Sequence, residues 1–211
     1  HWCSFVLGGG AKLVKGGLLT PEALAANRWF IDLYTDKHVE PPSAPSDGFL
    51  QTINNMKAGR TAMTIHHIGS ANELSAALGD AITAVPVPRG PHGEGWATYG
   101  DGSSAVLAQS KNRDAAWQWI AFLSTGANNV AFNKLSGQVT VTISGGRNWA
   151  FQPQRFMDTT VASLPMASVL PASSQTADFT RTVWPQTTQK ALLGQITPDE
   201  MMRTFEKLYF G

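Results

Sequence analysis

The 211-residue chain has little charge and no long apolar segment. Only 15% of its residues are charged, the formal net charge is +1, and the Lys and Arg side chains are scattered singly rather than clustered. A nucleic-acid partner requires clustered cations, so this distribution argues against a role in nucleic-acid binding. No apolar run approaches the roughly 18 to 20 residues of a membrane span, so we expect no direct membrane insertion by this chain.

Cysteine is nearly absent too, because Cys3 is the only one. A single cysteine excludes an intrachain disulfide and a thiolate zinc site, and the flanking Trp2 and Phe5 favour a small buried residue over a reactive thiol. A metal site at His66 and His67 has little support, because adjacent residues at a strand end should point to opposite sides. We therefore predict no metal ion.

Motifs of catalysis and of cofactor binding are missing as well. The chain has no GxSxG nucleophile elbow. Its GGGAK segment, residues 8–12, lacks the GKS or GKT ending of a phosphate-binding loop. The carboxylates that could act in pairs stand in unrelated contexts: Asp47, Asp80, Glu94, Asp101, Asp158 and Asp178. The sequence gives no positive sign of an enzyme or of a cofactor.

Helix signals are the clearest patterns that are present. Thr20 before Pro21 predicts a helix that runs to about Lys37. Its predicted buried stripe is Ala23, Ala26, Phe30 and Leu33. Thr197, Pro198 and Glu200 predict a capping box for a last helix, with Met201, Phe205 and Leu208 on its buried face. Further helices are predicted at 49–57, 70–79, 112–123, 128–135 and 178–193, and strands at 62–65, 82–87, 103–108 and 139–143. This alternation predicts an α/β protein.

One segment, residues 49–70, reads without a gap as an amphipathic helix, a glycine stop at Gly59, a short strand and a polar loop. The loop is His66-His67-Ile68-Gly69-Ser70. In open α/β sheets, ligands bind beyond the carboxyl ends of the strands. We therefore predict that this loop belongs to a ligand site.

The chain is rich in tryptophan, with seven residues. Trp2, Trp96 and Trp149 lie in irregular, glycine-rich sequence. An indole in such a segment either covers local core or offers a flat apolar platform to a ligand, and the sequence leaves both alternatives open.

Eight motifs, in this order along the chain, resemble those of family 1 extracellular solute-binding proteins. They are WxxxVLGGG from Trp2, TPEAxxAxxWFIDLY from Thr20, VEPPS from Val39, MKAGRTAMTI from Met56, AVPVPRG from Ala84, GDGSSAVLA from Gly100, DAAWQWIAFLS from Asp114 and GQITPDE from Gly194. The family contains the sugar receptors of bacterial ABC importers, such as maltose-binding proteins, and the resemblance covers nearly the whole chain.

The resemblance implies an incomplete type II periplasmic-binding-protein fold, an α/β receptor of two lobes that closes on its ligand about a hinge and performs no chemistry. The family's proteins are longer, and this chain resembles their C-terminal portion. By that layout, residues 1–99 and 160–211 build the second lobe, residues 100–159 belong to the first lobe, and residues 99–104 form a hinge crossing.

The resemblance also implies a carbohydrate ligand, either an oligosaccharide or a related polyol, and the permease subunits of an ABC importer as partners. It implies a location in the periplasm or outside the cell, with a surface lipoprotein as one form, and any signal region would lie upstream of His1. Sugar rings stack on aromatic side chains, and their hydroxyls bind planar polar groups. The candidate ligand-binding residues of these types, with the glycines between them, are Trp2, His66, His67, Gly69, Trp96, Tyr99, Gly100, Asp101, Gly102, Ser103 and Arg181. Many family members carry an aromatic residue where this chain has the His66 loop, and the departure favours either hydrogen bonding in place of stacking there or a bulkier ligand.

Two other functions stay open. One is a hydrolase acting on a glycoside or an ester from a similar α/β scaffold, for which Asp101 and His66 are the candidate catalytic residues. The other is a fragment without activity of its own that self-associates, for example by domain swapping, because a chain that lacks part of a lobe exposes apolar surface.

Overall fold

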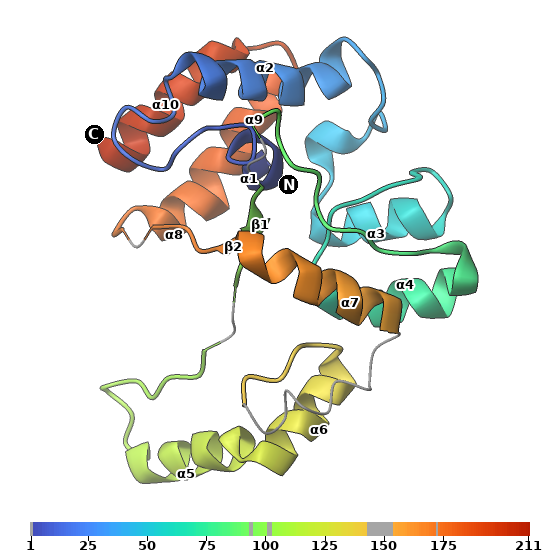
Figure 1. Cartoon of the computed structure of the whole chain (residues 1–211). Helices are drawn as coiled ribbons and strands as arrows, with labels where there is room; N and C mark the ends of the chain where they lie inside the picture. The colour runs from blue at the N-terminus through green and yellow to red at the C-terminus, as the bar shows by residue number, and fades with distance from the viewer. Residues whose placement is uncertain (1, 93–94, 101–102, 143–153, 172) are drawn as a thin grey trace. The chain divides into compact units, whose positions relative to one another are not determined.

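A computed structural model describes residues 2–92, 95–100, 103–142, 154–171 and 173–211, and these residues are mainly helical (Figure 1). The chain divides into two compact units. Unit 1 contains His1–Ile65, Val87–Tyr99 and Ser163–Gly211, and unit 2 contains the remainder, residues 66–86 and 100–162. The predicted lobes divide the chain differently over residues 66–86, and the lobe assignment stays a prediction. Each unit is described by itself.

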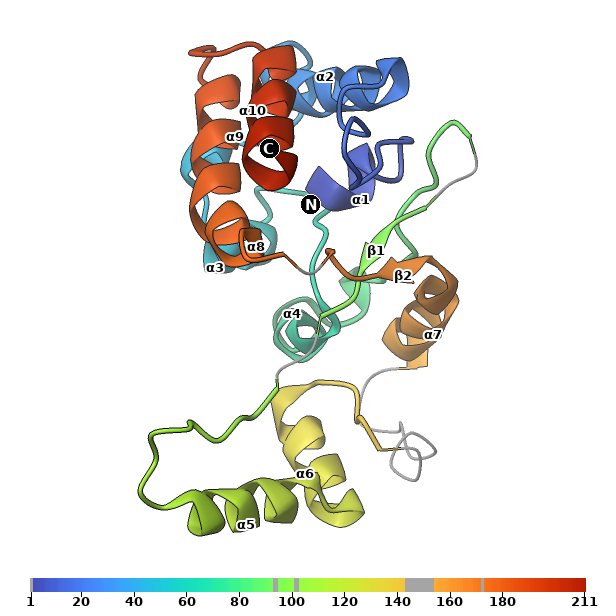
Figure 2. The same ribbon diagram turned by 90° about the vertical axis from the view of Figure 1, so that its left-hand side faces the viewer.

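Unit 1 is built mostly from helices that are far apart in the sequence. Its elements are α1 (Trp2–Val6), α2 (Pro21–Thr35), η1 (Ala44–Ser46), α3 (Phe49–Lys57), β1 (Ala97–Thr98), η5 (Leu164–Met166), β2 (Ala167–Ser168), α8 (Thr176–Asp178), the π-helix η6 (Phe179–Val183), α9 (Trp184–Leu192) and α10 (Pro198–Phe210). Helix α2 packs on α1 and α10. Helices α9 and α10 lie side by side, as Figure 2 shows.

The core of unit 1 forms where α1, α2 and α10 meet. The Trp2 ring packs edge-on against Phe205, with ring centroids 5.5 Å apart. The Trp2 indole Nε1 donates a hydrogen bond of 2.8 Å to Asn27 Oδ1, and Asn27 Nδ2 donates one of 2.8 Å to the carbonyl of Pro198. Of the predicted buried stripe of α2, Ala23 is buried and Ala26 and Phe30 are partly buried against this core, but the helix also buries Asn27 and Ile31, which the stripe did not include. Asn27 can be buried since both ends of its amide have partners.

Helix caps and ion pairs at the surface follow the sequence signals closely. Thr20 Oγ1 accepts a hydrogen bond from the Ala23 N–H, and the predicted capping box of α10 is present. Arg28 of α2 donates two hydrogen bonds to Asp199 of α10, at 2.7 and 2.5 Å. These bonds hold the pKa of Asp199 below its usual value. The two segments are therefore joined by a bidentate ion pair as well as by apolar packing.

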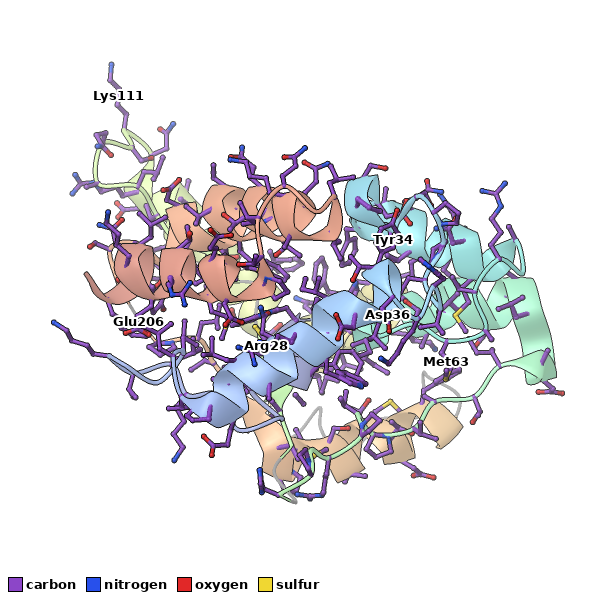
Figure 3. The ribbon with its side chains drawn as sticks, turned by 90° about the horizontal axis from the view of Figure 1, so that it is seen from above. Arg28, Tyr34, Asp36, Met63, Lys111 and Glu206 are labelled. Atoms are coloured by element: carbon purple, nitrogen blue, oxygen red, sulfur yellow. The ribbon has the colours of Figure 1, made fainter. Side chains whose placement is uncertain are left out.

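The loop between α1 and α2 is held by a single carboxylate. Glu206 accepts hydrogen bonds from the backbone N–H of Gly16 at 2.5 Å and of Leu18 at 3.3 Å. Figure 3 shows Glu206 and Arg28 on the helices that carry them. The buried face of α10 comprises Met201, Met202, Phe205 and Tyr209, whereas Leu208, predicted to be buried, is 46% exposed.

The strands are where the sequence-based expectations fail. The described strands are β1 and β2, which pair in parallel with Ala97 opposite Ala167 and Thr98 opposite Ser168. Residues 62–65, 82–87 and 103–108 form no strand, and neither do 139–142, while residue 143 lies outside the described residues. A strand needs a hydrogen-bonded neighbour, and these described segments pair with none in a ladder. Met63, in the middle of one of them, is 87% exposed.

Unit 2 contains η2 (Ile68–Ser70), α4 (Ala71–Leu78), η3 (Gly79–Ala81), α5 (Arg113–Ser124), α6 (Gly126–Ser136) and most of α7 (Gln154–Ser163). Helices α5 and α6 pack on each other, and Gly137 ends α6 in the left-handed conformation. The predicted helices here are confirmed, and Trp117 and Trp119 of α5 are each 60% exposed. No helix among the described residues has both the length and the hydropathy that a membrane crossing requires.

Candidate functional site

The loop that follows residue 65 brings three polar side chains together. The Ser70 hydroxyl lies 2.5 Å from His66 Nδ1 and 3.4 Å from His67 Nε2. The two imidazole rings are 4.8 Å apart, with an angle of 40° between their planes. The expectation that adjacent histidines point to opposite sides is therefore wrong. It assumed strand geometry, but the chain turns into η2 directly after His67.

The backbone fixes the position of His67. Its ring nitrogen Nδ1 accepts a hydrogen bond of 3.0 Å from the backbone N–H of Gly69. A Cβ atom at Gly69 would overlap the side-chain amide of Gln138 and crowd the His67 ring, so this position needs glycine for space. Ser70 is buried, with 7% of its surface exposed. His67 is exposed as a residue, but partial burial of its ring lowers its pKa, which favours the neutral imidazole.

This cluster can exchange hydrogen bonds with a ligand, but it offers little to a metal ion. No group of three or more His, Cys, Asp and Glu side chains suited to a metal ion occurs in the described part of the chain. In addition, the Gly69 N–H occupies one ring nitrogen of His67. Cys3, the other side chain with soft ligand chemistry, is half-buried, and burial raises the pKa of its thiol.

A second group of candidates lies where the chain leaves unit 1. The unit boundary falls between Tyr99 and Gly100, within the predicted hinge crossing. The Tyr99 N–H extends the pairing of β1 with β2 by donating to the Ser168 carbonyl at 2.8 Å, while Tyr99 as a residue is 52% exposed. Gly100 and Ser103 are exposed. Asp101 and Gly102 lie outside the described residues.

The tryptophan candidates separate into different roles. Trp2 is 1% exposed and fully engaged in the core of unit 1, so it is a packing residue and offers no platform in this structure. Trp96 is partly buried against the same core, and its indole N–H is buried with no hydrogen-bond partner among the described residues. Trp149 lies outside the described residues. Arg181 is an exposed residue of the π-helix η6, a type of helix that occurs often at functional sites.

The candidates are thus divided between the two units. Trp96, Tyr99 and Arg181 belong to unit 1, whereas the histidine loop, Gly100 and Ser103 belong to unit 2. A ligand contact made by both groups at once stays a prediction. Sequence reasoning placed Ser70 in the polar loop but did not predict its side-chain contacts with both histidines. The local signal for these contacts was the spacing, because Ser70 follows His67 by three residues and His66 by four.

The sequence model of a known family provides the decisive comparison. The model described as "Bacterial extracellular solute-binding protein" matches residues 4–129, which is more than half of the chain. The chain belongs to this family. The proteins of this family bind solutes and are not enzymes. A comparison with curated proteins gives no match.

Solved structures agree on the fold of this solute-binding protein. The maltose-maltodextrin binding protein of Alicyclobacillus acidocaldarius is 20% identical with a TM-score of 0.78, and 98% of this chain covers 58% of that one. Maltose-bound MalE3 of T. maritima is 16% identical (TM-score 0.78; 99% of this chain and 56% of that chain). An ABC transporter solute-binding protein of Thermotoga lettingae, bound with α-D-tagatose, is 19% identical (TM-score 0.78; 99% and 54%).

These similarities confirm the type II periplasmic-binding-protein fold, of which this chain holds a part. The chain spans little more than half the length of the solved structures it matches.

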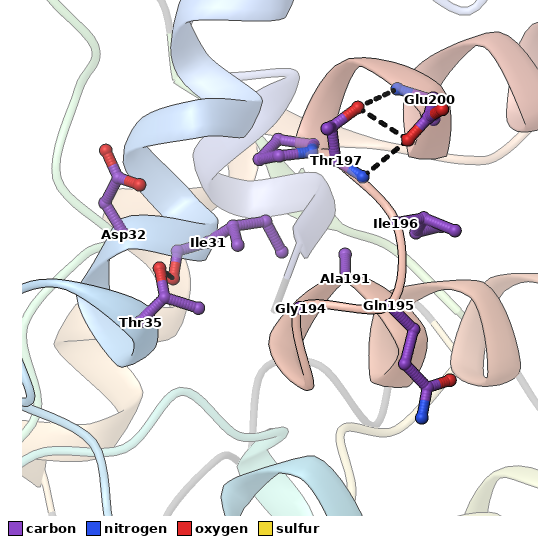
Figure 4. A pocket seen from close by; sticks show the side chains of 10 residues that line it. Ile31, Asp32, Thr35, Ala191, Gly194, Gln195, Ile196, Thr197 and Glu200 are labelled. Carbon is purple, nitrogen blue, oxygen red and sulfur yellow. Dashed lines mark hydrogen bonds between the residues drawn. The ribbon is translucent and has the colours of Figure 1, made fainter.

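A shallow, open depression in unit 1 of this solute-binding protein is lined by none of the candidate residues. It measures about 390 Å³ and opens between α2 and the loop from α9 to α10, where Asp32, Gln195 and Glu200 contribute polar groups (Figure 4). Glu200 is already occupied, since its carboxylate accepts from the Thr197 N–H at 2.7 Å and the Thr197 hydroxyl at 2.9 Å. The depression is therefore explained by the capping of α10 and is not a candidate ligand site.

Proposed function

We propose that this chain is part of an extracytoplasmic solute-binding protein that captures a carbohydrate in a cleft between two lobes and delivers it to an ABC importer. The family match carries the binding role. Structures of the same fold that bind maltose, maltodextrin or tagatose support a carbohydrate, namely an oligosaccharide or a related polyol. The permease subunits of the importer are the macromolecular partners in this proposal.

The ligand contacts are proposed for the histidine loop and the crossing segment. His66 and His67 supply hydrogen-bonding groups at the start of unit 2, and Tyr99 supplies an exposed phenol at the end of a unit 1 segment. Sugar recognition needs this combination of planar polar groups and aromatic surface. The proposed lobes are residues 1–99 with 160–211, and residues 100–159, joined by the crossing at residues 99–104.

Calorimetry with the full-length protein against a panel of oligosaccharides, monosaccharides and polyols tests the proposal. We expect saturable binding of at least one sugar, weakened by His66→Ala and unchanged by His92→Ala, which alters an exposed histidine elsewhere. A folded full-length protein that binds no member of the panel would exclude the carbohydrate assignment and leave the fold assignment standing.

The location of the protein can be tested separately. We propose that it acts in the periplasm or at the outer face of the cell, as a free protein or as a lipoprotein whose signal region lies outside these 211 residues. Fractionation of cells that express the natural gene, followed by detection of the protein in the periplasmic or surface fraction, checks this location. Recovery in the cytoplasmic fraction alone would contradict it.

A further inference from the structure

We propose that Ser70 is a positioning residue that fixes His66 in the tautomer with the proton on Nε2, the same tautomer that the Gly69 N–H sets at His67. The loop then presents its imidazoles with a defined hydrogen-bond polarity. The proposal rests on four groups in one short segment, namely the Gly69 N–H, the two rings and the Ser70 hydroxyl.

The first step follows from the backbone. An N–H of the main chain can only donate, so the Gly69 N–H bond at 3.0 Å makes His67 Nδ1 an acceptor. A neutral imidazole carries one proton, so the proton of His67 must sit on Nε2. The lowered pKa of His67 agrees with a neutral ring at physiological pH.

The second step derives the donor and acceptor roles of the Ser70 hydroxyl from the tautomer of His67. His67 Nε2 lies 3.4 Å from Ser70 Oγ, a long hydrogen bond in which the ring is the donor. Ser70 has a single proton to donate, and its closest acceptor is His66 Nδ1 at 2.5 Å. His66 therefore also carries its proton on Nε2. The chain of donors runs from Gly69 N–H to His67, then to Ser70, and then to His66.

Packing makes this order difficult to reverse. Ser70 is buried, and any side chain at Gly69 would collide with Gln138 and His67. A buried hydroxyl has few alternative partners, and breaking its hydrogen bonds leaves polar groups unsatisfied. The tautomers are thus set by the loop itself rather than by solvent.

The consequence for binding rests on the proposed function. Because Nδ1 of His66 accepts from Ser70, the polar hydrogen of this ring lies on Nε2, and His66 can act at that atom only as a donor. Such a donor matches an acceptor oxygen, as in a sugar hydroxyl or ring ether. Ser70 would therefore act on ligand affinity through His66, without touching the ligand.

The direct test is ¹⁵N-histidine NMR of the full-length protein above the titration range of its imidazoles, with single His→Gln variants to assign each ring. Wild type should show only the Nε2–H pattern for both rings. Ser70→Ala should return His66 toward the tautomer mixture of an unrestrained imidazole, whereas Ser70→Thr, which keeps the hydroxyl, should preserve the wild-type pattern. Ser75→Ala is the matched control, because Ser75 Oγ of the following helix α4 is buried and has no hydrogen-bond partner among the described residues.

Circular dichroism on each variant confirms that it is folded. A proton on Nδ1 of His66 in wild type, or an unchanged His66 pattern in folded Ser70→Ala, would overturn the proposal. If the glycan panel yields a ligand, Ser70→Ala should weaken its binding roughly tenfold while Ser70→Thr and Ser75→Ala do not. If no glycan binds, the proposed function fails, but the tautomer measurement still decides the role of Ser70.

Discussion

Asn27 is the residue whose replacement tests the core of unit 1 most directly. It is 0% exposed, accepts from the Trp2 indole at 2.8 Å and donates to the Pro198 carbonyl at 2.8 Å. We choose Asn27→Leu, because leucine has a similar size and therefore removes the two hydrogen bonds without opening a large cavity.

The expected cost follows from the groups left behind. The buried Trp2 N–H loses its partner, which costs about 1–3 kcal/mol. The Pro198 carbonyl belongs to the first turn of α10 and keeps its helical acceptor role, so its lost bond adds only about 1 kcal/mol. The total, about 2–4 kcal/mol, is a large part of the roughly 5–15 kcal/mol by which a typical domain is stable.

Urea denaturation followed by far-ultraviolet circular dichroism measures this loss. With a slope of about 2 kcal/mol per molar urea, in the middle of the usual range, the midpoint should fall by roughly 1–2 M. Asn54→Leu is the control, since Asn54 occupies an exposed helical position in α3 and its replacement should change stability by less than about 0.5 kcal/mol. The reasoning is refuted if Asn27→Leu costs no more than this control.

Three further predictions concern other parts of the chain. Glu206→Gln should loosen the loop between α1 and α2, which its carboxylate holds through two backbone N–H groups, and faster amide exchange and proteolysis there would show it. Gly90→Ala should destabilise unit 1 by about 1–3 kcal/mol, because its new methyl group would overlap a neighbouring backbone oxygen, whereas Gly48→Ala, with no atom nearby, should not. NMR titration of His67 should give a pKa below the ordinary value of about 6.5. The unfolded chain then binds the proton more readily than the folded chain. The free energy of unfolding should therefore fall as the pH drops below about 6.5 and become constant below the pKa of the folded state.

Helix ends were predictable because their signals are local. Thr20 and Thr197 each satisfy backbone N–H groups within three residues, and the structure confirms both caps. Pro185 stands in the first turn of α9, directly after the π-helix, a position that tolerates proline. In each case the deciding contacts lie within one turn of the residue itself.

Strands and buried polar residues were not predictable in the same way, because their partners lie far along the chain. The Ala97–Thr98 strand forms only against residues 167–168, so its own sequence carries no sufficient signal. Asn27 lies outside the predicted buried stripe, and its contacts with Trp2 and Pro198 explain its burial. The predicted directions of the His66 and His67 side chains were wrong for a related reason, because the prediction assumed the alternation of a strand where no strand forms.

The motifs that carry the family resemblance serve packing and helix capping, whereas the histidine loop is proposed to bind the ligand. Gly8 and Gly90 come from two of those motifs, and a Cβ atom at Gly90 would overlap the Gly8 carbonyl oxygen, so both serve close packing within unit 1. The Thr20 motif caps α2. Packing and capping of this kind are needed whatever solute the protein holds. In our proposal, the choice of ligand depends instead on the hydrogen-bond polarity that Ser70 imposes on His66, which the family motifs do not determine.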